Sequence, residues 1–160
     1  PAPETSNERA ETGTLSHESI VGAAAAVDFI ASLGDGDTRR QRLTHAFARM
    51  HERDSHLVSR LWSGLANIDG VRLYGRPPDA HRTALVASTV GGANSRAVAE
   101  FLAERGLLLS DGNFYAASAV ERLGVADQGL LRAGWSVYTT LDEVDRLLAG
   151  VEEFVRSGRR

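Results

Sequence analysis

The chain has 160 residues, 42% of them apolar, which suffices for one domain of ordinary size with a packed core. Its formal net charge is −3 and no stretch carries a block of basic residues, so the composition favours neither a nucleic-acid partner nor an anionic membrane surface. Cysteine and lysine are both absent, which excludes disulfides, thiol nucleophiles and any Schiff base to a lysine of this chain.

The first residues of the chain do not resemble a secretion signal. Residues 1–13 are expected to be extended or loose, and the first residues lack the basic and apolar regions of such a signal. Because the chain begins at Pro1 without a methionine, we expect that it was processed or truncated. The longest apolar runs, such as 21–27, are far shorter than the roughly 20 residues that cross a bilayer. We therefore expect a soluble protein of the cytoplasm.

Two helices are predicted in the first part of the chain. Ser16 is a suitable N-cap and Gly34 a suitable C′ residue for the first helix, whose apolar side chains recur at spacings of three and four. After a loop at 35–37, Thr38 can cap a second helix that continues to about Asn67. At 1.5 Å per residue that helix measures roughly 45 Å, which exceeds the core of a domain of this size. Part of it is therefore expected to pack on something else.

The apolar stripe of the second helix has one polar interruption. Asp54 stands where the spacing predicts another apolar residue. The stripe otherwise consists of Leu43, Phe47, Met50, Leu57, Leu61 and Leu65.

Strand and helix signals alternate in the second half of the chain. Stretches rich in β-branched residues are separated by turn residues, and Thr140 with Glu143 forms a capping box that opens the last helix. This pattern predicts a compact mixed α/β domain in which helices pack on a sheet. The expected strands are 71–74, 83–90, 107–109 and 130–138, and the expected helices are 95–105, 117–123 and one beginning at 141.

Two histidines of the second helix resemble a zinc motif. His51-Glu52 is followed by His56, whereas the motif H-E-x-x-H places its histidines four residues apart on one helix face. A spacing of five separates the two imidazoles by about 140° around the helix. We therefore predict solvated helix histidines rather than a metal site.

Arg132 is the first candidate binding residue, because it interrupts an otherwise apolar stretch that suits a buried strand. A buried guanidinium requires a partner, and a carboxylate bound by two hydrogen bonds is the best one. An arginine at a sheet edge, or one paired with a local acid, would explain the same residue without any ligand.

A second candidate site precedes the first helix. The segment Glu-Thr-Gly-Thr at 11–14 places Gly13, Thr14 and backbone N–H groups just ahead of the helix N-terminus. Such groups suit a phosphate, because the N–H groups and the helix dipole both favour negative charge. Simple capping of the helix is the alternative.

Taken in order, these segments resemble the class V aminotransferases, which include cysteine desulfurases and isopenicillin N epimerase-like proteins. The likeness rests on 11–14 and the alanine-rich helix that follows, on 99–106, and on 132–146, which is the most specific block. It implies the small C-terminal domain of a fold-type-I pyridoxal-phosphate enzyme, with an antiparallel or mixed sheet and helices on one side.

The resemblance also implies how the chain is organised. Residues 1–37 would be the end of the large cofactor-binding domain, 38–69 the long connecting helix, and 70–160 the small C-terminal domain. The partners would be that large domain of the same protein and a second copy in a homodimer. The cofactor, pyridoxal 5'-phosphate, would be bound covalently by a lysine that this chain does not contain.

Five residues take roles through the same resemblance. Gly13 and Thr14 would reach the cofactor phosphate of the other subunit, and Arg132 would bind the α-carboxylate of a small amino substrate. Cysteine desulfurases carry their nucleophilic cysteine in the loop that here contains Asn113 and Tyr115. Since this chain has no cysteine, these two residues would line the substrate pocket instead.

The sequence therefore predicts the C-terminal part of a pyridoxal-phosphate-dependent transferase, similar to cysteine desulfurases but without their catalytic cysteine. It would act on an amino acid or related amine by transamination, epimerisation or elimination. Without a lysine, this chain alone is expected to be non-catalytic. A non-catalytic binding or dimerisation module derived from the same small domain is the alternative.

Overall fold

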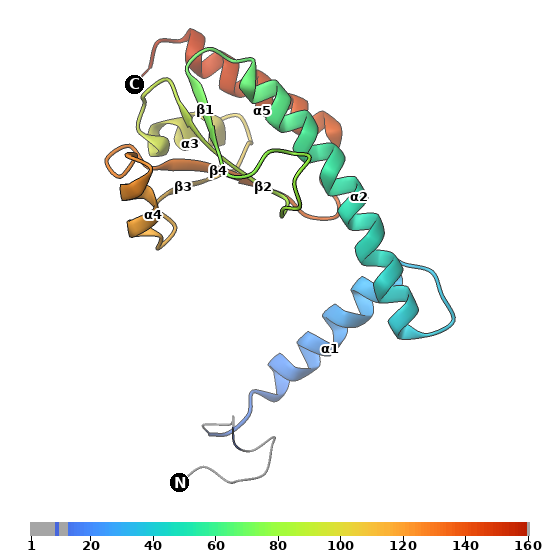
Figure 1. Cartoon of the computed structure of the whole chain (residues 1–160). Helices are drawn as coiled ribbons and strands as arrows, with labels where there is room; N and C mark the ends of the chain where they lie inside the picture. Colours follow the sequence, from blue (N-terminus) through green and yellow to red (C-terminus); the bar gives the residue numbers. More distant parts are fainter. Residues whose placement is uncertain (1–8, 10–12, 160) are drawn as a thin grey trace. The chain divides into compact units, whose positions relative to one another are not determined.

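The structure, a computed structural model, describes residue 9 and residues 13–159. The chain forms two compact units, residues 1–50 and residues 51–160. Helix α2 (Arg39–Ala66) begins in the first unit and ends in the second (Figure 1). No helix in the described part of the chain combines the length and the apolar content needed to cross a membrane.

The first unit contains helix α1 (His17–Ser32), whose predicted ends are confirmed. Ser16 is the N-cap, and its hydroxyl accepts a hydrogen bond from the Ser19 N–H at 3.4 Å. Gly34 follows the C-cap, but its backbone is not in the left-handed region that usually selects glycine there. Gly34 is needed for space instead, because a Cβ atom would collide with the Arg42 carbonyl and lie 2.6 Å from the Ala46 nitrogen.

Helix α1 is apolar and yet almost bare. Ala31 is its one buried residue among those described. The side chains of Ile20, Val21 and Phe29 are 53%, 68% and 57% exposed. A helix that is apolar around most of its circumference is usually buried on several sides, so α1 lacks the neighbours that its composition requires.

Helix α2 starts at a cap that the sequence predicted. The Thr38 hydroxyl accepts from the Gln41 N–H at 3.2 Å, and the Gln41 side chain accepts from the Thr38 N–H at 2.9 Å. These reciprocal bonds satisfy two backbone donors that a helix start leaves open. In the first unit, an ion pair of 2.9 Å between Arg39 and Asp28 links α2 to α1.

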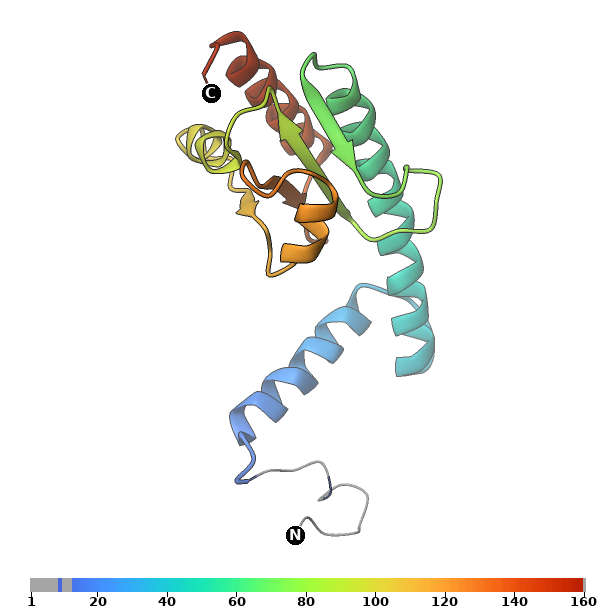
Figure 2. The ribbon, with the colours of Figure 1, turned by 60° about the vertical axis from the view of Figure 1, so that its left-hand side comes forward.

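The second unit contains a four-stranded antiparallel sheet (Figure 2). The strand order is β1-β2-β4-β3, so β2 and β4 are the inner strands. The prediction of a mixed α/β domain is confirmed, and the sheet is antiparallel throughout. The strands are β1 (Val71–Tyr74), β2 (Leu85–Val90), β3 (Ser110–Gly112) and β4 (Leu130–Gly134).

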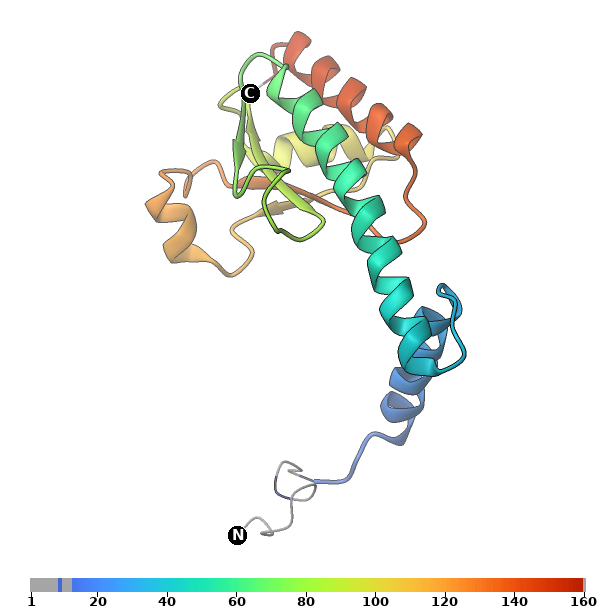
Figure 3. The same cartoon turned by 45° about the vertical axis from the view of Figure 1, so that its right-hand side comes forward.

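Three helices cover one face of this sheet, so the prediction of helices on one side holds for these three but not for the short helix at 117–122. The C-terminal half of α2, α3 (Ser95–Ala103) and α5 (Leu141–Arg156) supply the main core, and α2 and α5 run side by side (Figures 1 and 3). Arg60 of α2 and Asp145 of α5 form an ion pair of 2.7 Å across these two helices. The largest fully buried side chains of the described residues are Phe154, Leu61, Leu102, Val86, Val90, Val98 and Val151.

The short helix α4 (Ala117–Arg122) packs on the opposite face of the sheet. Its Val120 joins a second, smaller cluster with Tyr74 and Leu130, which stand on the strand positions that alternate away from the main core. Both faces of the sheet therefore carry apolar contacts, and the smaller cluster lies close to Arg132.

The prediction of a strand at 107–109 is wrong. The chain is extended there, but strand pairing begins only at Ser110 and ends at Gly112. Leu107 and Leu109 pack against the main core while Leu108 is 86% exposed. Their apolar side chains reflect packing against neighbouring helices, which periodicity alone does not separate from strand pairing.

Two other strand ends differ from their predictions. Strand β4 stops at Gly134 instead of 138, because the following residues leave the sheet and bind to α2. Strand β2 begins at Leu85 instead of 83, after a tight turn in which the Leu85 N–H donates to the Thr83 carbonyl at 2.9 Å. The predicted helices 95–105 and 117–123 are confirmed with slightly earlier ends.

Gly34→Ala is expected to open the α1–α2 hairpin of the first unit. The added methyl group would meet backbone atoms of α2, and such overpacking costs about 1–3 kcal/mol. Gly22→Ala in the middle of α1 is the matched control, because a Cβ there meets no atom within 4 Å and alanine favours a helix by about 1 kcal/mol. Amide hydrogen exchange across α1 should therefore become faster in G34A and slower in G22A. Equal exchange in both variants would contradict the packing that we describe.

The capping box of α5 should make stability depend on pH. The pKa of Glu143 lies below its usual 4.5 because its carboxylate accepts from the Thr140 backbone N–H and hydroxyl. A group with a lowered folded-state pKa stabilises the fold above its unfolded pKa and loses that effect as pH falls through the folded value. The free energy of urea unfolding of the wild type should exceed that of Glu143→Gln at pH 7, and the gap should close below pH 4.5. A gap that is constant from pH 7 to pH 3 would refute this role.

Candidate functional site

Arg132 lies in the middle of the inner strand β4. Its neighbours Leu131 and Ala133 are buried in the main core, so the alternation of the strand directs Arg132 to the opposite face. The adjacent residues across the sheet are Ala87 on β2 and Ser110 on β3. Arg132 is therefore half-buried in the centre of a sheet, not at its edge.

The guanidinium of Arg132 lies over an aromatic ring. Its central carbon is 4.0 Å from the ring centroid of Phe114. Within residue 9 and residues 13–159, no carboxylate pairs with Arg132 and none of its N–H groups makes a hydrogen bond. Two explanations without a ligand were open, a position at the sheet edge and pairing with a local acid. Neither applies within the described residues. The arrangement suits an external carboxylate, which can accept two N–H bonds from one guanidinium.

Asn113 and Tyr115 flank Phe114 in the loop after β3. The Asn113 side-chain oxygen accepts from the Tyr115 N–H at 3.1 Å, and the Asn113 carbonyl accepts from the Ala116 N–H at 2.8 Å. Phe114 and Tyr115 have φ of 54° and 60°, a left-handed conformation that costs residues other than glycine about 1–2 kcal/mol each. The two predicted pocket residues therefore lie in the loop that contacts Arg132, and the Tyr115 side chain is fully exposed.

Gly13 and Thr14 lie in the first unit, immediately before α1. Both are exposed, and a Cβ atom at Gly13 would meet nothing within 4 Å. Glu11 and Thr12, the other half of the predicted Glu-Thr-Gly-Thr segment, lie outside the described residues. Gly13 and Thr14 are thus accessible beside a helix N-terminus, where an anion is favoured by the helix dipole.

The connection from β4 to α5 is held by two polar contacts with α2. The Trp135 indole N–H donates to the Asp54 carboxylate at 3.0 Å, and the Arg53 guanidinium donates to the Thr139 carbonyl. Asp54 is the residue that interrupts the apolar stripe of α2, and the indole explains why an acceptor is required there. This connection begins three residues after Arg132, so α2 helps to fix how the chain leaves the strand.

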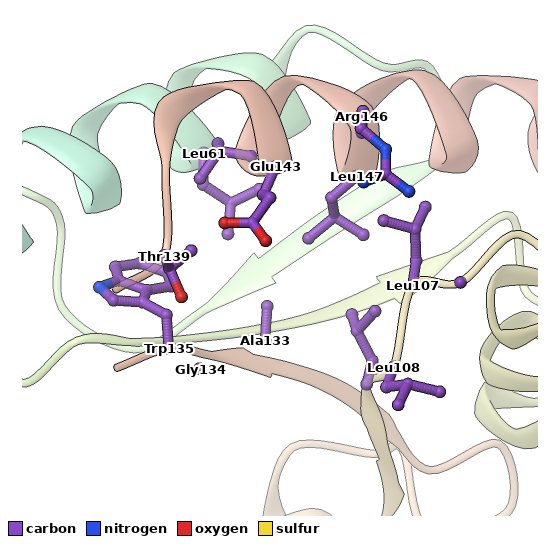
Figure 4. Close-up of a pocket in the computed structure, with 13 residues that line it drawn as sticks. Leu61, Leu107, Leu108, Ala133, Gly134, Trp135, Thr139, Glu143, Arg146 and Leu147 are labelled. Carbon is purple, nitrogen blue, oxygen red and sulfur yellow. The ribbon is translucent and has the colours of Figure 1, made fainter. Parts of the chain in front are cut away.

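A cavity of about 190 Å³ adjoins this connection (Figure 4). Trp135, Thr139 and Glu143 line one part of it, and leucines of 107–109 line another. The Glu143 carboxylate is already engaged by Thr140, as described for the capping box. Arg146 also lines the cavity, so polar and apolar side chains share its wall, and none of the candidate site residues lies in it.

Of the two histidines that resemble a zinc motif, His51 contacts a third histidine outside the helix. The ring of His51 stacks on that of His81, with centroids 5.9 Å apart, beside a second cavity of about 270 Å³. In the described residues no three His, Cys, Asp or Glu side chains are grouped to hold a metal ion.

Comparison with known proteins identifies the family. The family model "Aminotransferase class-V" matches residues 3–147, so the chain belongs to the class V aminotransferases. A protein of Mycobacterium leprae (strain TN), described as "Probable cysteine desulfurase 2", is 34% identical over 151 residues. That alignment covers 94% of this chain and 32% of the relative. The resemblance inferred from the sequence is thereby confirmed.

Solved structures show the same relationship. The apo structure of a cysteine desulfurase from Thermococcus onnurineus NA1 matches with a TM-score of 0.77 and 28% identity, over 94% of this chain and 34% of that one. A mutant of C-DES, described with glycine covalently linked to its PLP cofactor, matches with a TM-score of 0.62 over 91% of this chain and 31% of that one. At 23% identity this second likeness shows the fold alone. The chain spans about a third of the length of the proteins that it matches.

Phe114 and the Asp54–Trp135 pair were not selected by the sequence reasoning. Phe114 gave no signal, because its contact with Arg132 joins residues 18 positions apart that no local pattern connects. The signal for Asp54 was present, since a polar residue in an apolar stripe must find a partner. Trp135 is a natural one, because a buried indole N–H also requires an acceptor.

The Asp54–Trp135 hydrogen bond is expected to stabilise the second unit. Asp54→Leu removes the acceptor from a half-buried donor and should lower the free energy of unfolding by about 1–3 kcal/mol. Asp54→Asn retains an acceptor oxygen and should cost less. A double-mutant cycle with Trp135→Phe, measured by urea unfolding, separates the pairwise energy from other effects. Additive losses would mean that the hydrogen bond contributes nothing.

Proposed function

We propose that this chain is the C-terminal part of a pyridoxal-phosphate-dependent enzyme that acts on an amino acid or a related amine. Arg132 would bind the α-carboxylate of the substrate. The observation that carries this proposal is a half-buried guanidinium at the centre of a sheet, stacked on Phe114 and paired with no described acid. Burying a cation in this way is costly unless an anion joins it.

The residues of this chain fit a supporting role toward the cofactor. Pyridoxal phosphate supplies an electron sink for bonds at the substrate's α-carbon. Its covalent attachment needs a lysine, which must come from outside this chain because the chain has none. Gly13 and Thr14 would contribute backbone N–H groups and a hydroxyl to the cofactor phosphate, across the interface of a homodimer. Their exposure beside the N-terminus of α1 supports this assignment.

The bare surface of α1 supports a lysine-bearing domain as the partner. Leu15, Val21 and Phe29 are large apolar side chains that are at least 42% exposed. Contiguous apolar surface of this kind usually marks an interface. We therefore propose that residues 1–37 complete the large cofactor-binding domain, that 38–69 connect it to the small domain, and that 70–160 form the small domain.

The absence of cysteine limits the reaction of the proposed enzyme. A cysteine desulfurase that passes sulfur through a persulfide needs a thiolate, and this chain supplies none. Asn113 and Tyr115 would line the substrate pocket in the loop where that thiolate would be expected. We therefore propose transamination, epimerisation or elimination on an amino substrate.

The decisive experiment is an absorbance spectrum of the protein that contains this chain together with its lysine-bearing domain, with and without added pyridoxal phosphate. A visible band of bound cofactor that borohydride abolishes is expected. Arg132→Ala should leave the band unchanged and weaken the binding of L-alanine roughly 100-fold, because an unpaired buried carboxylate loses about 3 kcal/mol. Ethylamine, which has no carboxylate, should bind both proteins alike.

Two results would contradict the proposal. A folded protein without the cofactor band would favour a non-catalytic binding or dimerisation module. A normal band with unchanged L-alanine affinity in Arg132→Ala would assign the carboxylate to another residue.

A further inference from the structure

Phe114 occupies a backbone conformation that aromatic residues rarely adopt. Its φ is 54°, and that of the next residue, Tyr115, is 60°. Left-handed residues other than glycine persist only where the surroundings impose them, and such residues are concentrated at functional sites. Here the Asn113 side chain imposes the turn by accepting from the Tyr115 N–H at 3.1 Å.

The ring of Phe114 is anchored by the smaller apolar cluster. Phe114 packs against that cluster, in which Val120, Val125 and Leu130 are 4%, 3% and 7% exposed. Leu130 belongs to the same strand as Arg132, two residues earlier, and so points to the same face of the sheet. The ring is thus held in place by strand β4 and helix α4 together.

The anchored ring determines how Arg132 is presented. A guanidinium carbon 4.0 Å from the ring centroid is within the range of a favourable cation–π contact. A guanidinium that lies over the face of a ring makes no conventional hydrogen bond to it, so its N–H donors stay available to a carboxylate. The contact therefore restricts the orientation of the cation without using any of the donors that a ligand needs.

We propose that Phe114 is a positioning residue that holds the Arg132 guanidinium ready for a substrate carboxylate. This inference rests on the proposed function, since it concerns the same carboxylate site. A residue with a purely packing role would not need a strained backbone, because an aliphatic side chain on an ordinary turn could fill the same apolar cluster. Pre-organisation explains the strain, since a guanidinium that is already oriented loses less freedom when the ligand binds.

The first test measures the contact itself. Phe114→Leu keeps an apolar side chain for the cluster but removes the aromatic face, and Phe114→Tyr keeps both. In NMR spectra of the chain, the Arg132 Nε–Hε resonance should be shifted upfield by the ring in the wild type and in F114Y. It should lose that shift in F114L. An unchanged resonance in F114L overturns the inference, whether or not the protein binds a cofactor.

The second test measures binding to the cofactor-loaded protein that contains this chain. F114L should weaken the binding of L-alanine about tenfold, as expected for the loss of a partly buried cation–π contact. The affinity of F114Y for L-alanine should stay within about twofold of that of the wild type. Ethylamine should bind all three proteins equally, because it has no carboxylate for Arg132. Combined with Arg132→Ala, F114L should add no further loss.

Phe101→Leu is the matched control, because it removes another ring in contact with an arginine. The ring centroid of Phe101 is 3.4 Å from the central guanidinium carbon of Arg105, and Phe101 belongs to the main core, on the face of the sheet that Arg132 does not face. It should leave the L-alanine to ethylamine ratio unchanged. A similar loss for ethylamine in F114L, or an additive loss in the double variant, overturns the positioning role. A wild type that takes up no cofactor refutes the proposed function itself. Normal uptake, an intact R132A effect and no F114L effect refute only the inference.

Discussion

The position of Arg132 depends on the main core, which lies between one face of the sheet and the helices α2, α3 and α5. The two-residue alternation of β4 assigns Leu131 and Ala133 to that core and therefore turns Arg132 to the other face. Because β4 is paired on both sides, a shift of one residue would move both apolar side chains out of the main core and place the cation in it. The hydrophobic contacts of its neighbours thus hold the guanidinium more firmly than its own contacts do.

The same long helix that supplies core leucines also controls the exit from β4. Arg53 and Asp54 of α2 bind Thr139 and Trp135, and these bonds end the strand and direct the chain toward the capped start of α5. Asp54 occupies a position of the helix stripe that would otherwise be apolar, and its carboxylate makes this connection. As a result, the sheet holds Arg132 from both sides, and α2 binds the chain just beyond it.

The chain belongs to the class V aminotransferases, and its residue types and its exposed surface both favour the proposed division between a part that binds and a part that reacts. The chain has no lysine and no cysteine, so the reactive groups of the proposed enzyme would come from elsewhere. In the proposed enzyme it would contribute recognition: the Arg132 guanidinium for a carboxylate and an accessible helix N-terminus for a phosphate. The exposed apolar side chains of α1 would supply the surface through which the chain joins the proposed catalytic domain.

Local chemistry in the sequence determined where helices start, because a cap such as Thr38 or Thr140 bonds to a residue three positions away. Periodicity and motifs also determined the mixed α/β fold and the family, and they singled out Arg132. Tertiary structure decided where strands end, since 107–109 and the residues after Gly134 find their partners on distant elements. It also decided that Phe114 lies beneath Arg132. That contact requires a strained loop, a strand and a helix to lie next to one another, and no local sequence pattern predicts this.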